Sequence, residues 1–550
     1  RKLMSRYGVC EHEVDQLLRN DVFVDLYKLV KNGLLIGEPR YSIKNVEHLY
    51  RGARETEVGN GGDSVVVFEN WRELNAQGLE GDTWQTSKIL NDIRDYNIDD
   101  CDSTQELVDW LREQQAEYNI AYIGSSDVSE PELTEAKAEE INARTQLRDQ
   151  LLARAESEKA TNPEQAQLTE NLAWMLEFHR REAKPVFWRL FDRLGLTDDE
   201  LVDDLDCLAY CQRTEREPFK VGRARQFSYE YRFDANQEFK QAGGSSYYLL
   251  GHEDEAGKNL KASWKRDESD MPAGLIVLQA KAELPDIISL IPDEYISADI
   301  IAKSLEQVVK AYASNSLGQA AIIDFLKRSA PRIHGQQSGD AVVSSHDPME
   351  RLEQIKTAIA NLDNSYLAIQ GPPGAGKTFT GKHVIAELLQ QGKKIGICSN
   401  SHKAINNLLL GTAIHCNENT IDAYFACSKD TDPALLEQGV SILKNTEIAN
   451  HLDGACVIGT TAWGFSRDDL ADEFDYLFID EAGQVSVANL IAISRAAKNL
   501  ILMGDQMQLG QPAQGTHPAD SGLSVLDYLL HETPTIPDHM GVFLGTTYRM

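Results

Sequence analysis

The sequence predicts an α/β protein, and three observations support this fold class. From residue 350 onward, apolar runs typical of strands alternate with helical runs, the pattern of a parallel sheet covered by helices. Within that region, "SYLAIQGPPGAGKTFTGKHVIAELLQQG" consists of a strand, a glycine-rich loop and a helix, in that order. Upstream, the short β-rich runs "RQFSYEYRF", "SSYYLLG" and "GLIVLQAK" are separated by turn-forming residues, which indicates a small barrel or sandwich.

The composition limits the class of protein. The chain has 550 residues, enough for roughly three or four domains. Its net charge of −32 excludes a globally basic nucleic-acid-binding protein, although a few side chains can still form a local basic groove. No apolar run approaches the ~18 residues of a membrane span, and the first residues carry no signal-peptide pattern. Because the chain starts at Arg1, we expect a fragment, truncated at both ends.

The eight cysteines form no CxxC pair. A chain of this length needs no disulfides to build a core, so we expect reduced thiols in a cytoplasmic protein. An iron–sulfur or zinc site, completed by residues outside this sequence, is the alternative. Cys207 and Cys211 lie four residues apart, which fits one face of a helix.

The patterning changes along the chain in a way that predicts its domains. Residues 1–125 mix apolar runs, such as "DVFVDLYKLV" and "DSVVVFENW", with one long helix, as in a mixed α/β domain. The next segment is helical and charged, with Leu147, Leu151 and Leu152 at helical spacing. The predicted order is a mixed α/β domain (1–125), a helical connector (126–214), a small barrel (215–296), a helix and linker (297–349) and a parallel-sheet domain (350–545).

The glycine-rich loop fits a phosphate-binding site. Gly371-x4-Gly376-Lys377-Thr378 matches the P-loop pattern. Glycines let the backbone N–H groups turn toward one point, where they and the following helix N-terminus bind the β-phosphate of a nucleotide. We expect Lys377 to reach the β- and γ-phosphate oxygens and the Thr378 hydroxyl to ligate Mg²⁺. ATP and Mg²⁺ are therefore the expected cofactors.

An acidic pair follows a second strand. In "FDYLFIDEAGQ", residues 476–479 form a buried-type strand. Asp480 and Glu481 stand at its C-terminal end, where open α/β sheets bind their ligands. We expect Asp480 to hold Mg²⁺ through water and Glu481 to polarise the attacking water. In so acidic a chain, a surface acidic pair is the alternative.

Four motifs in order carry a family resemblance. "GPPGAGKT", "DEAGQ", "GDQMQL" (504–509) and the terminal "TTYRM" resemble motifs I to IV of superfamily I helicases of the Upf, Sen and Dna branch. One position departs, because Thr547 stands where these helicases commonly have Gln. The resemblance implies that residues 350–545 form a RecA-like domain and that residues 546–550 begin a second one. It also implies a small barrel held on a helical stalk.

The resemblance gives roles to further residues. Gln354 would pair with adenine, with a plain surface glutamine as the alternative. Gln484 and Gln508 would sense the γ-phosphate or its attacking water, and Arg549 would act on the γ-phosphate as an arginine finger. The predicted nucleotide-binding residues are Gln354, Gly371, Pro372, Pro373, Gly374, Ala375, Gly376, Lys377, Thr378, Phe379, Gln484 and Arg549. The predicted catalytic residues of this site are Lys377, Asp480, Glu481, Gln508 and Arg549.

In helicases of this branch the nucleic-acid strand crosses the RecA-like domains, which implies two contact segments here. The first is "CSNSHKAINNLL" (398–409), where phosphate donors are offered by Ser401, His402, Lys403 and Asn406. The second is "CVIGTTAWGF" (456–465), where Thr460 and Thr461 lie at a strand end. The expected partner is single-stranded nucleic acid, DNA more than RNA.

A carboxylate interrupts an apolar stripe in the first 125 residues. The stripe recurs at helical spacing and consists of Ile89, Ile93, Tyr96, Asp100, Thr104, Leu107 and Leu111. An unpaired buried carboxylate is costly. Asp100 should therefore bind a divalent metal, form an ion pair or serve as a cap.

The same region also carries a resemblance, through "FVDLYKLV", "YSIKNVEHLY", "GGDSVVVFENW" and "YNIDDCDST". These segments resemble RNase-H-like exonuclease domains of the DEDD class, and more closely bacterial RecB-like nucleases fused to such helicases. The resemblance implies that Asp100 binds a catalytic metal (Mg²⁺ or Mn²⁺) and that Tyr96 orients the attacking water, with further carboxylates before residue 1. Asp25 fits a strand but is better explained as structural.

Together these features predict an ATP-dependent superfamily I DNA helicase or translocase, fused to a metal-dependent RNase-H-like exonuclease module and acting in nucleic-acid processing or repair. One alternative is a helicase, of DNA or RNA, whose nuclease-like module only binds nucleic acid. The other is a P-loop ATPase that serves as a switch or clamp without unwinding. No membrane partner is expected.

Overall fold

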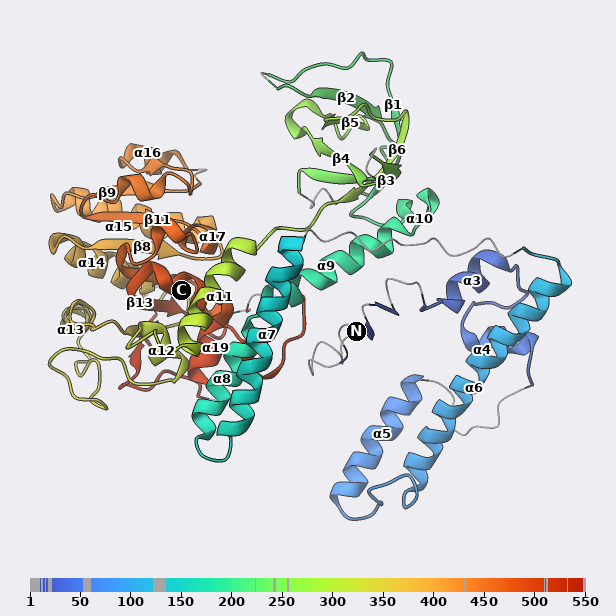
Figure 1. Cartoon of the computed structure of the whole chain (residues 1–550), viewed down its shortest axis with the longest axis horizontal. Coiled ribbons are helices and arrows are strands. Elements are labelled where there is room, and N and C mark those ends of the chain that lie inside the picture. Colours follow the sequence, from blue (N-terminus) through green and yellow to red (C-terminus); the bar gives the residue numbers. More distant parts are fainter. Residues whose placement is uncertain are drawn as a thin grey trace. The chain divides into compact units, whose positions relative to one another are not determined.

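The computed structural model describes most of the chain (Figure 1). The described residues are 10, 13–14, 16–17, 22–52, 61–121, 135–222, 224–240, 244–254, 257–429, 432–508, 510, 513–531 and 533–547. They fall into two compact units, Cys10–Glu132 and a larger one that contains Leu133–Met550. Across these ranges, no helix is both long and apolar enough to cross a membrane.

The regular elements described in the smaller unit are all helical. They are α3 (Leu26–Gly33), α4 (Ile43–Val46), the short 3-10 helix η1 (Glu47–Leu49), α5 (Gly61–Ala76) and α6 (Lys88–Glu117). Ser87 caps α6, because its side chain accepts a hydrogen bond from the Leu90 N–H. Val30, Val46 and Leu107 form a small buried core.

The expectation of strands in residues 1–125 is corrected for the part that the structure describes. "DSVVVFENW" lies within α5, and "LYKLV" begins α3. Asp25 is not in a strand; its carboxylate accepts a hydrogen bond from the Tyr27 N–H (2.9 Å) at the start of α3. An isolated apolar run cannot pair its backbone groups unless another strand lies beside it, whereas a helix satisfies them internally. Local apolar content therefore misled the assignment.

Four helices occupy the segment where a helical connector was expected. They are α7 (Glu135–Glu158), α8 (Pro163–Met175), α9 (Phe178–Leu194) and α10 (Asp198–Val202). Leu151 is buried, with Leu147 and Leu152 packed around it, as the helical spacing predicts. Leu151 and Leu172 belong to a core that they share with strands of the parallel sheet. Helices α7 and α8 are therefore packed into that domain.

Six antiparallel strands form a closed barrel in the order β1-β2-β5-β4-β3-β6, which confirms the predicted small barrel (Figure 1). The strands are β1 (Leu208–Arg213), β2 (Phe227–Arg232), β3 (Ser246–Glu253), β4 (Asn259–Trp264), β5 (Leu275–Ala280) and β6 (Ile287–Pro292). Pairing of β1 with β6 closes the barrel and leaves no open sheet edge. Tyr231, Tyr247 and Leu290 are among the side chains that fill its interior.

The barrel starts earlier than expected. Strand β1 precedes residue 215 and contains Cys211, so Cys207 and Cys211 do not share a helix face. Both are buried reduced thiols. The ladder is irregular between Leu208 and Cys211, and Tyr210 has a φ of 54°. This bulge disturbs the alternation by which a strand is recognised in a sequence.

The parallel-sheet domain has eight strands in the order β10-β9-β11-β8-β12-β13-β7-β14, and neighbouring strands are parallel, which confirms the predicted α/β class. The strands are β7 (Tyr366–Gln370), β8 (Lys394–Cys398), β9 (Tyr424–Cys427), β10 (Ser441–Ile442), β11 (Cys456–Gly459), β12 (Phe474–Ile479), β13 (Ala497–Gly504) and β14 (Gly541–Phe543). Side chains alternate between two cores, with Tyr366 and Ala368 in one and Leu367 and Ile369 in the other. Burial on both faces explains the continuous apolar runs in the sequence.

Helices cover both faces of this sheet (Figure 1). One core includes residues of α7, α8, α11 and α18, and the other includes residues of α13, α14 and α15. Turns without helix or strand join α12 to α13, in the place of the expected linker. The helices are α11 (Asp299–Ala313), α12 (Ala321–Leu326), α13 (Pro348–Ala360), α14 (Lys377–Gln390), α15 (His402–Glu418), α16 (Pro433–Glu437), α17 (Ala462–Phe465), α18 (Val487–Ile493) and α19 (Val525–Leu530). Short 3-10 helices are η2 (Arg266–Glu268), η3 (Ile448–His451), η4 (Asp468–Leu470), η5 (Ala482–Gln484), η6 (Ser494–Ala496) and η7 (Ala519–Gly522).

Candidate functional site

The carboxyl ends of four adjacent strands form one edge of the parallel sheet. Strands β8, β12, β13 and β7 are neighbours in that order. Their last residues are in register, with Cys398 opposite Ile479 and Gly504 opposite Gln370. The segments that follow these strands are the ones singled out in the sequence. Parallel pairing therefore brings four distant motifs to a single edge.

The loop after β7 has the backbone that its glycines permit. Gly374 (φ 80°) and Gly376 (φ 90°) occupy the left-handed region, and Gly376 is the N-cap residue directly before α14. Gly371 is required for another reason, since a Cβ there would lie 2.9 Å from the Leu544 carbonyl oxygen. Its N–H donates to the Gly504 carbonyl (3.1 Å), which joins the loop to the end of β13. The N-terminus of α14 thus opens from this loop, as the P-loop motif predicts.

Lys377 lies across its own loop. Its ammonium Nζ donates to the carbonyls of Gly371 (2.6 Å) and Pro372 (3.2 Å). Lys377 is buried, whereas Thr378 and Phe379 on the first turn of α14 are exposed. The predicted Mg²⁺-ligating hydroxyl is therefore accessible, and the lysine charge is held within the glycine-rich loop.

Asp480 is a buried carboxylate at the end of β12. Its N–H donates to the Cys398 carbonyl (2.9 Å), and its Oδ1 accepts from the Glu481 N–H (3.0 Å). Burial raises the pKa of Asp480 to about 6, repulsion from Glu481 adds to this, and the charge of Lys377 opposes it. The lysine and the acidic pair are therefore close enough to interact electrostatically. Such a carboxylate is stabilised by a cation, so the site fits Mg²⁺.

Glu481 has strained backbone geometry. Its φ of 54° and ψ of 45° lie in the left-handed region, which non-glycine residues seldom adopt. The turn packs tightly, because a Cβ on Gly483 would lie 2.6 Å from the Asp505 carbonyl oxygen. Gln484 ends η5, and its carbonyl accepts a hydrogen bond from the Asn400 side chain. The acidic pair is thus fixed against the segments after β13 and β8.

The segment after β13 starts with a buried aspartate. The Asp505 carboxylate accepts a hydrogen bond from the Met507 N–H (2.9 Å), which shapes the turn that presents Gln508. Gln508 is half-buried at this edge of the sheet. Arg549, predicted as the arginine finger, lies outside the described residues. Its role stays a prediction.

Gln354 lies on the first half of α13 and is engaged with the preceding loop. Its carbonyl oxygen accepts from the N–H groups of Ser344 (2.8 Å) and Ser345 (3.0 Å), and its Nε2 donates to the Ser344 hydroxyl (3.3 Å). These bonds tie the side chain to the loop before α13, and a surface glutamine with a structural role stays the alternative. Adenine recognition by this amide stays a prediction.

The predicted nucleic-acid contacts divide into exposed and buried groups. Ser401 and Lys403 are exposed, and His402 and Thr461 are half-buried. Burial lowers the pKa of His402, and the charge of Lys429 lowers it further. Contact with phosphates through these side chains stays a prediction.

The other two predicted contacts, Asn406 and Thr460, are buried. The Asn406 amide donates to the Lys429 carbonyl (3.0 Å). The Thr460 hydroxyl donates to Asn445 Oδ1 (2.9 Å) and shares a second hydrogen bond with the Ser428 hydroxyl (2.9 Å). These side chains tie the two loops internally, contrary to the expectation of exposed donors. Residue type alone did not reveal their burial.

In the smaller unit, the packed face of α6 differs from the predicted stripe. Tyr96, Ser103 and Leu107 are buried, Asp100 is half-buried and Thr104 is exposed. The helix face thus passes through Ser103 rather than Thr104, because 3.6 residues per turn shift the stripe over this distance. Tyr96 and Asp100 still lie on neighbouring turns.

Sequence reasoning missed a polar network beside this face. Arg51 pairs with Asp99 (2.6 Å) and with Glu106 (3.4 Å). The Ser103 hydroxyl donates to Glu47 (3.1 Å). Among the residues that the structure describes, no group of three or more His, Cys, Asp or Glu side chains could hold a metal ion. The described surroundings of Asp100 therefore do not by themselves form a two-metal site.

Comparison with known families gives two matches. Residues 352–521 match the AAA domain family, and residues 1–112 match the RNase_H superfamily. The chain therefore contains a region similar to the RNase_H superfamily, followed by a region similar to the AAA domain family. This confirms the predicted combination of modules at the level of these superfamilies.

Several curated relatives are described as ATP-dependent helicases or helicase/nucleases, and others as DNA-binding proteins. The DNA replication ATP-dependent helicase/nuclease JHS1 of Arabidopsis thaliana is 27% identical over 198 residues, which cover 33% of this chain and 13% of the relative. The ATP-dependent helicase NAM7 of Saccharomyces cerevisiae is 29% identical over 217 residues, which cover 33% of this chain and 22% of the relative. The chain thus spans less than a quarter of the length of each of these relatives.

Solved structures with some similarity are also helicases. The crystal structure of Arterivirus nonstructural protein 10 (helicase) has 16% identity and a TM-score of 0.23, covering 60% of this chain and 52% of that one. The Pif1 helicase from Candida albicans has 14% identity and a TM-score of 0.20, covering 38% and 40%.

Proposed function

We propose that this chain contains the ATP-binding motor domain of a superfamily I DNA helicase or translocase, joined to an RNase-H-like module of the RecB-like nuclease type. One observation carries the proposal. Lys377, Asp480 and the segment that presents Gln508 follow three adjacent parallel strands at one edge of the sheet, and the charge of Lys377 opposes the rise that burial causes in the pKa of Asp480. The curated relatives' descriptions as ATP-dependent helicases support the same assignment.

The chemistry follows from the positions of these groups. The loop amides and the N-terminus of α14 would hold the β-phosphate, and Lys377 would turn from the Gly371 carbonyl to the β- and γ-phosphate oxygens. Thr378 and Asp480 would hold Mg²⁺, which neutralises charge on the phosphates when bound. Glu481 would polarise the attacking water. Because burial raises the pKa of Asp480, a bound cation would favour the ionised form of this carboxylate.

Three further residues complete the proposed nucleotide site. Gln484 and Gln508 would contact the γ-phosphate or its water, and Arg549 would donate to the γ-phosphate from the opposite face. Adenine binding by Gln354 would compete with the Ser344 and Ser345 amides. The loop before α13 would therefore change its hydrogen bonds when nucleotide binds.

The nucleic-acid strand would pass over the loops that follow β8 and β11. Ser401, His402, Lys403 and Thr461 are the accessible donors for phosphates. The buried side chains of Asn406 and Thr460 would hold these loops in place through internal hydrogen bonds. Such contacts bind the backbone without reading sequence.

The proposal for the smaller unit has two forms. In the first, Asp100 binds a divalent metal with carboxylates from outside the described residues and Tyr96 orients the water. In the second, the module only binds nucleic acid. Asp100→Asn in the complete protein separates them: the first form expects loss of metal-dependent DNA cleavage with ATP hydrolysis kept, and unchanged cleavage contradicts it.

ATP hydrolysis by the complete protein, measured with and without single-stranded DNA, tests the motor proposal. We expect stimulation by DNA in the wild type and no turnover in Lys377→Ala. Hydrolysis that does not respond to DNA would favour a P-loop switch or clamp. Turnover retained in Lys377→Ala would contradict the site itself.

A further inference from the structure

The segment that follows Gln508 is anchored on helix α9. The Glu182 carboxylate accepts hydrogen bonds from the N–H groups of Gln514 (3.0 Å) and Gly515 (2.9 Å) and from His517 Nε2 (2.7 Å). The His517 ring stacks on Phe178, with 4.5 Å between centroids. Burial acts to raise the pKa of Glu182, but the bonds from His517 and the two amides lower it overall. The segment is therefore bound to an ionised carboxylate.

Gly515 lets this segment reach the backbone of α9. A Cβ at this position would lie 2.7 Å from the Arg181 carbonyl oxygen, which no side chain could tolerate without a shift. Pro185, four residues after Arg181 in the helix, has no N–H to donate to that carbonyl. The segment thus packs on α9 where the helix's own hydrogen bonding is interrupted.

Arg189 joins the same segment to the end of the barrel. Its Nη2 donates to the Gln514 side-chain oxygen (3.2 Å), and its Nη1 lies 3.1 Å from an oxygen of Glu294, just after β6. Glu182 and Arg189 are seven residues apart, so they lie on the same side of α9. One helix face therefore contacts both the segment after β13 and the barrel.

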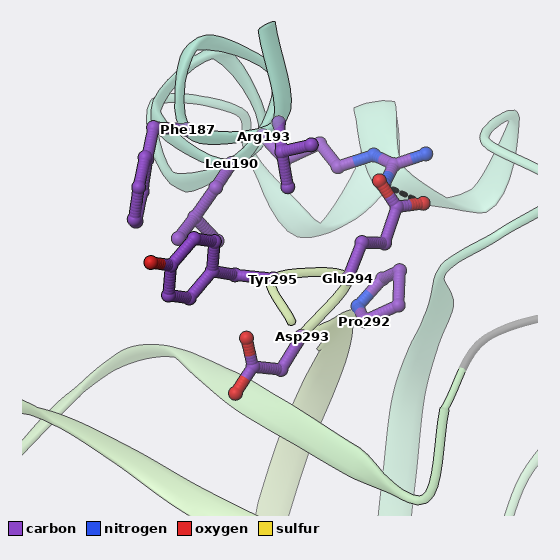
Figure 2. Close-up of a pocket in the computed structure, with 8 residues that line it drawn as sticks. Phe187, Leu190, Arg193, Pro292, Asp293, Glu294 and Tyr295 are labelled. Carbon is purple, nitrogen blue, oxygen red and sulfur yellow. Dashed lines mark hydrogen bonds and ion pairs between the residues drawn. The ribbon is translucent and has the colours of Figure 1, made fainter. Parts of the chain in front are cut away.

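The barrel end is held firmly on α9 (Figure 2). Arg193 is bonded to Glu294 (3.3 Å) and to Asp204 (2.7 Å), and the Phe187 and Tyr295 rings pack 4.7 Å apart. Figure 2 shows these rings beside the Arg193–Glu294 pair. The cavity left between the two surfaces is about 10 Å³. Because the interface between α9 and the barrel is closely packed, a displacement of one requires the other to move with it.

We propose that α9 couples the nucleotide site to the barrel. Glu182 and Arg189 are positioning residues. A displacement of residues 513–517, caused by nucleotide contact with the end of β13, passes through Arg189 to Glu294 and shifts the barrel on α9. Nucleotide can drive this shift only if its contacts differ between the nucleotide-free and the nucleotide-bound positions of residues 513–517. In the proposal, Gln508 makes the contact that differs. The inference rests on the proposed function, because it needs nucleotide at the β13 end.

Hydrogen–deuterium exchange on the whole chain, with and without a nonhydrolysable ATP analogue and Mg²⁺, tests the coupling. In the wild type we expect nucleotide to change exchange at residues 513–523 and at residues 284–296. In Arg189→Met we expect the first change to remain and the second to be lost. Arg189 is 44% exposed, so its replacement leaves folding intact, whereas Glu182→Gln puts folding at risk.

Arg216→Met is the matched control. Arg216 is 48% exposed and pairs with Glu230 inside the barrel (2.7 Å), so its loss should leave both responses unchanged. A barrel response that persists in Arg189→Met, or that is absent from a wild type that binds the analogue, overturns the coupling. Titration of the same samples with a fluorescent nucleotide shows whether the wild type binds nucleotide at all. If the wild type does not bind, the proposed function fails first.

Discussion

At the scale of single residues, the site combines opposite charges that the fold keeps out of water. Lys377 is held by carbonyls of its own loop, and Asp480 is buried beside Glu481. Without a cation, an ionised Asp480 opposes folding. The buried charge of Asp480 therefore lowers the stability of the folded chain, and a metal-bound nucleotide would restore it. Such a cost is typical of functional sites.

Asp480→Asn should stabilise the nucleotide-free protein at neutral pH. The pKa of Asp480 is raised from 3.8 to about 6 in the folded chain, so the folded state binds the proton more tightly than the unfolded state. The ionised form then costs about 3 kcal/mol above pH 6, and this cost falls as the pH drops toward 4. Thermal unfolding between pH 8 and pH 5.5 should show a stabilisation by Asp480→Asn that is largest at pH 8.

The control for this prediction is Asp469→Asn, at an exposed carboxylate paired with Arg467 (2.9 Å). It should not reproduce the stabilisation. A melting temperature for Asp480→Asn that equals the wild type at pH 8 would show that the carboxylate carries no burial cost.

At the scale of elements, sequence patterns predicted the parts of the sheet that carry the site. Apolar runs that end in a motif predicted strand β12 and the strand, loop and helix around Gly376. Parallel strands that are buried on both faces have such continuous apolar runs. The same reasoning failed at α5, where an apolar run had no partner strand, and at β1, where a bulge hid the alternation. The hydrogen bonds between residues 514–517 and α9 could not be predicted either, because the bonded residues are over three hundred positions apart in the sequence.

In the loops after β8 and β11, one substitution should affect DNA binding and another should affect the stability of the fold. Lys403→Ala removes an exposed cation and should weaken single-stranded DNA binding, with a smaller salt dependence, while leaving stability unchanged. Thr460→Val leaves the Asn445 and Ser428 partners unpaired and should cost about 1–3 kcal/mol of stability. Fluorescence anisotropy and denaturant unfolding measure the two effects. Loss of DNA binding in a fully stable Thr460→Val would reverse these roles.

At the scale of the whole molecule, two kinds of region are joined in one chain. The RNase H-like match over residues 1–112 and the AAA match over residues 352–521 agree with the order read from the sequence. Composition could not predict these two matches, because a net charge of −32 is the sum over all side chains and does not reveal a local site. The motifs revealed it, because each one fixes a few groups at a strand end. The packing of α7 and α8 into the sheet domain depends on distant contacts that no local pattern encodes.

Equilibrium binding of a fluorescent ATP analogue with Mg²⁺, compared between the wild type and Lys377→Ala, tests the central claim most directly. If the loop, the lysine and Asp480 form one nucleotide site, the wild type should bind and the variant should bind at least about tenfold more weakly, a loss of about 1.4 kcal/mol. Unfolding curves should show both proteins folded under the binding conditions, with the variant somewhat less stable, because Lys377 bonds to its own loop and its charge favours the ionised form of Asp480. Equal affinity of the two proteins would contradict the claim.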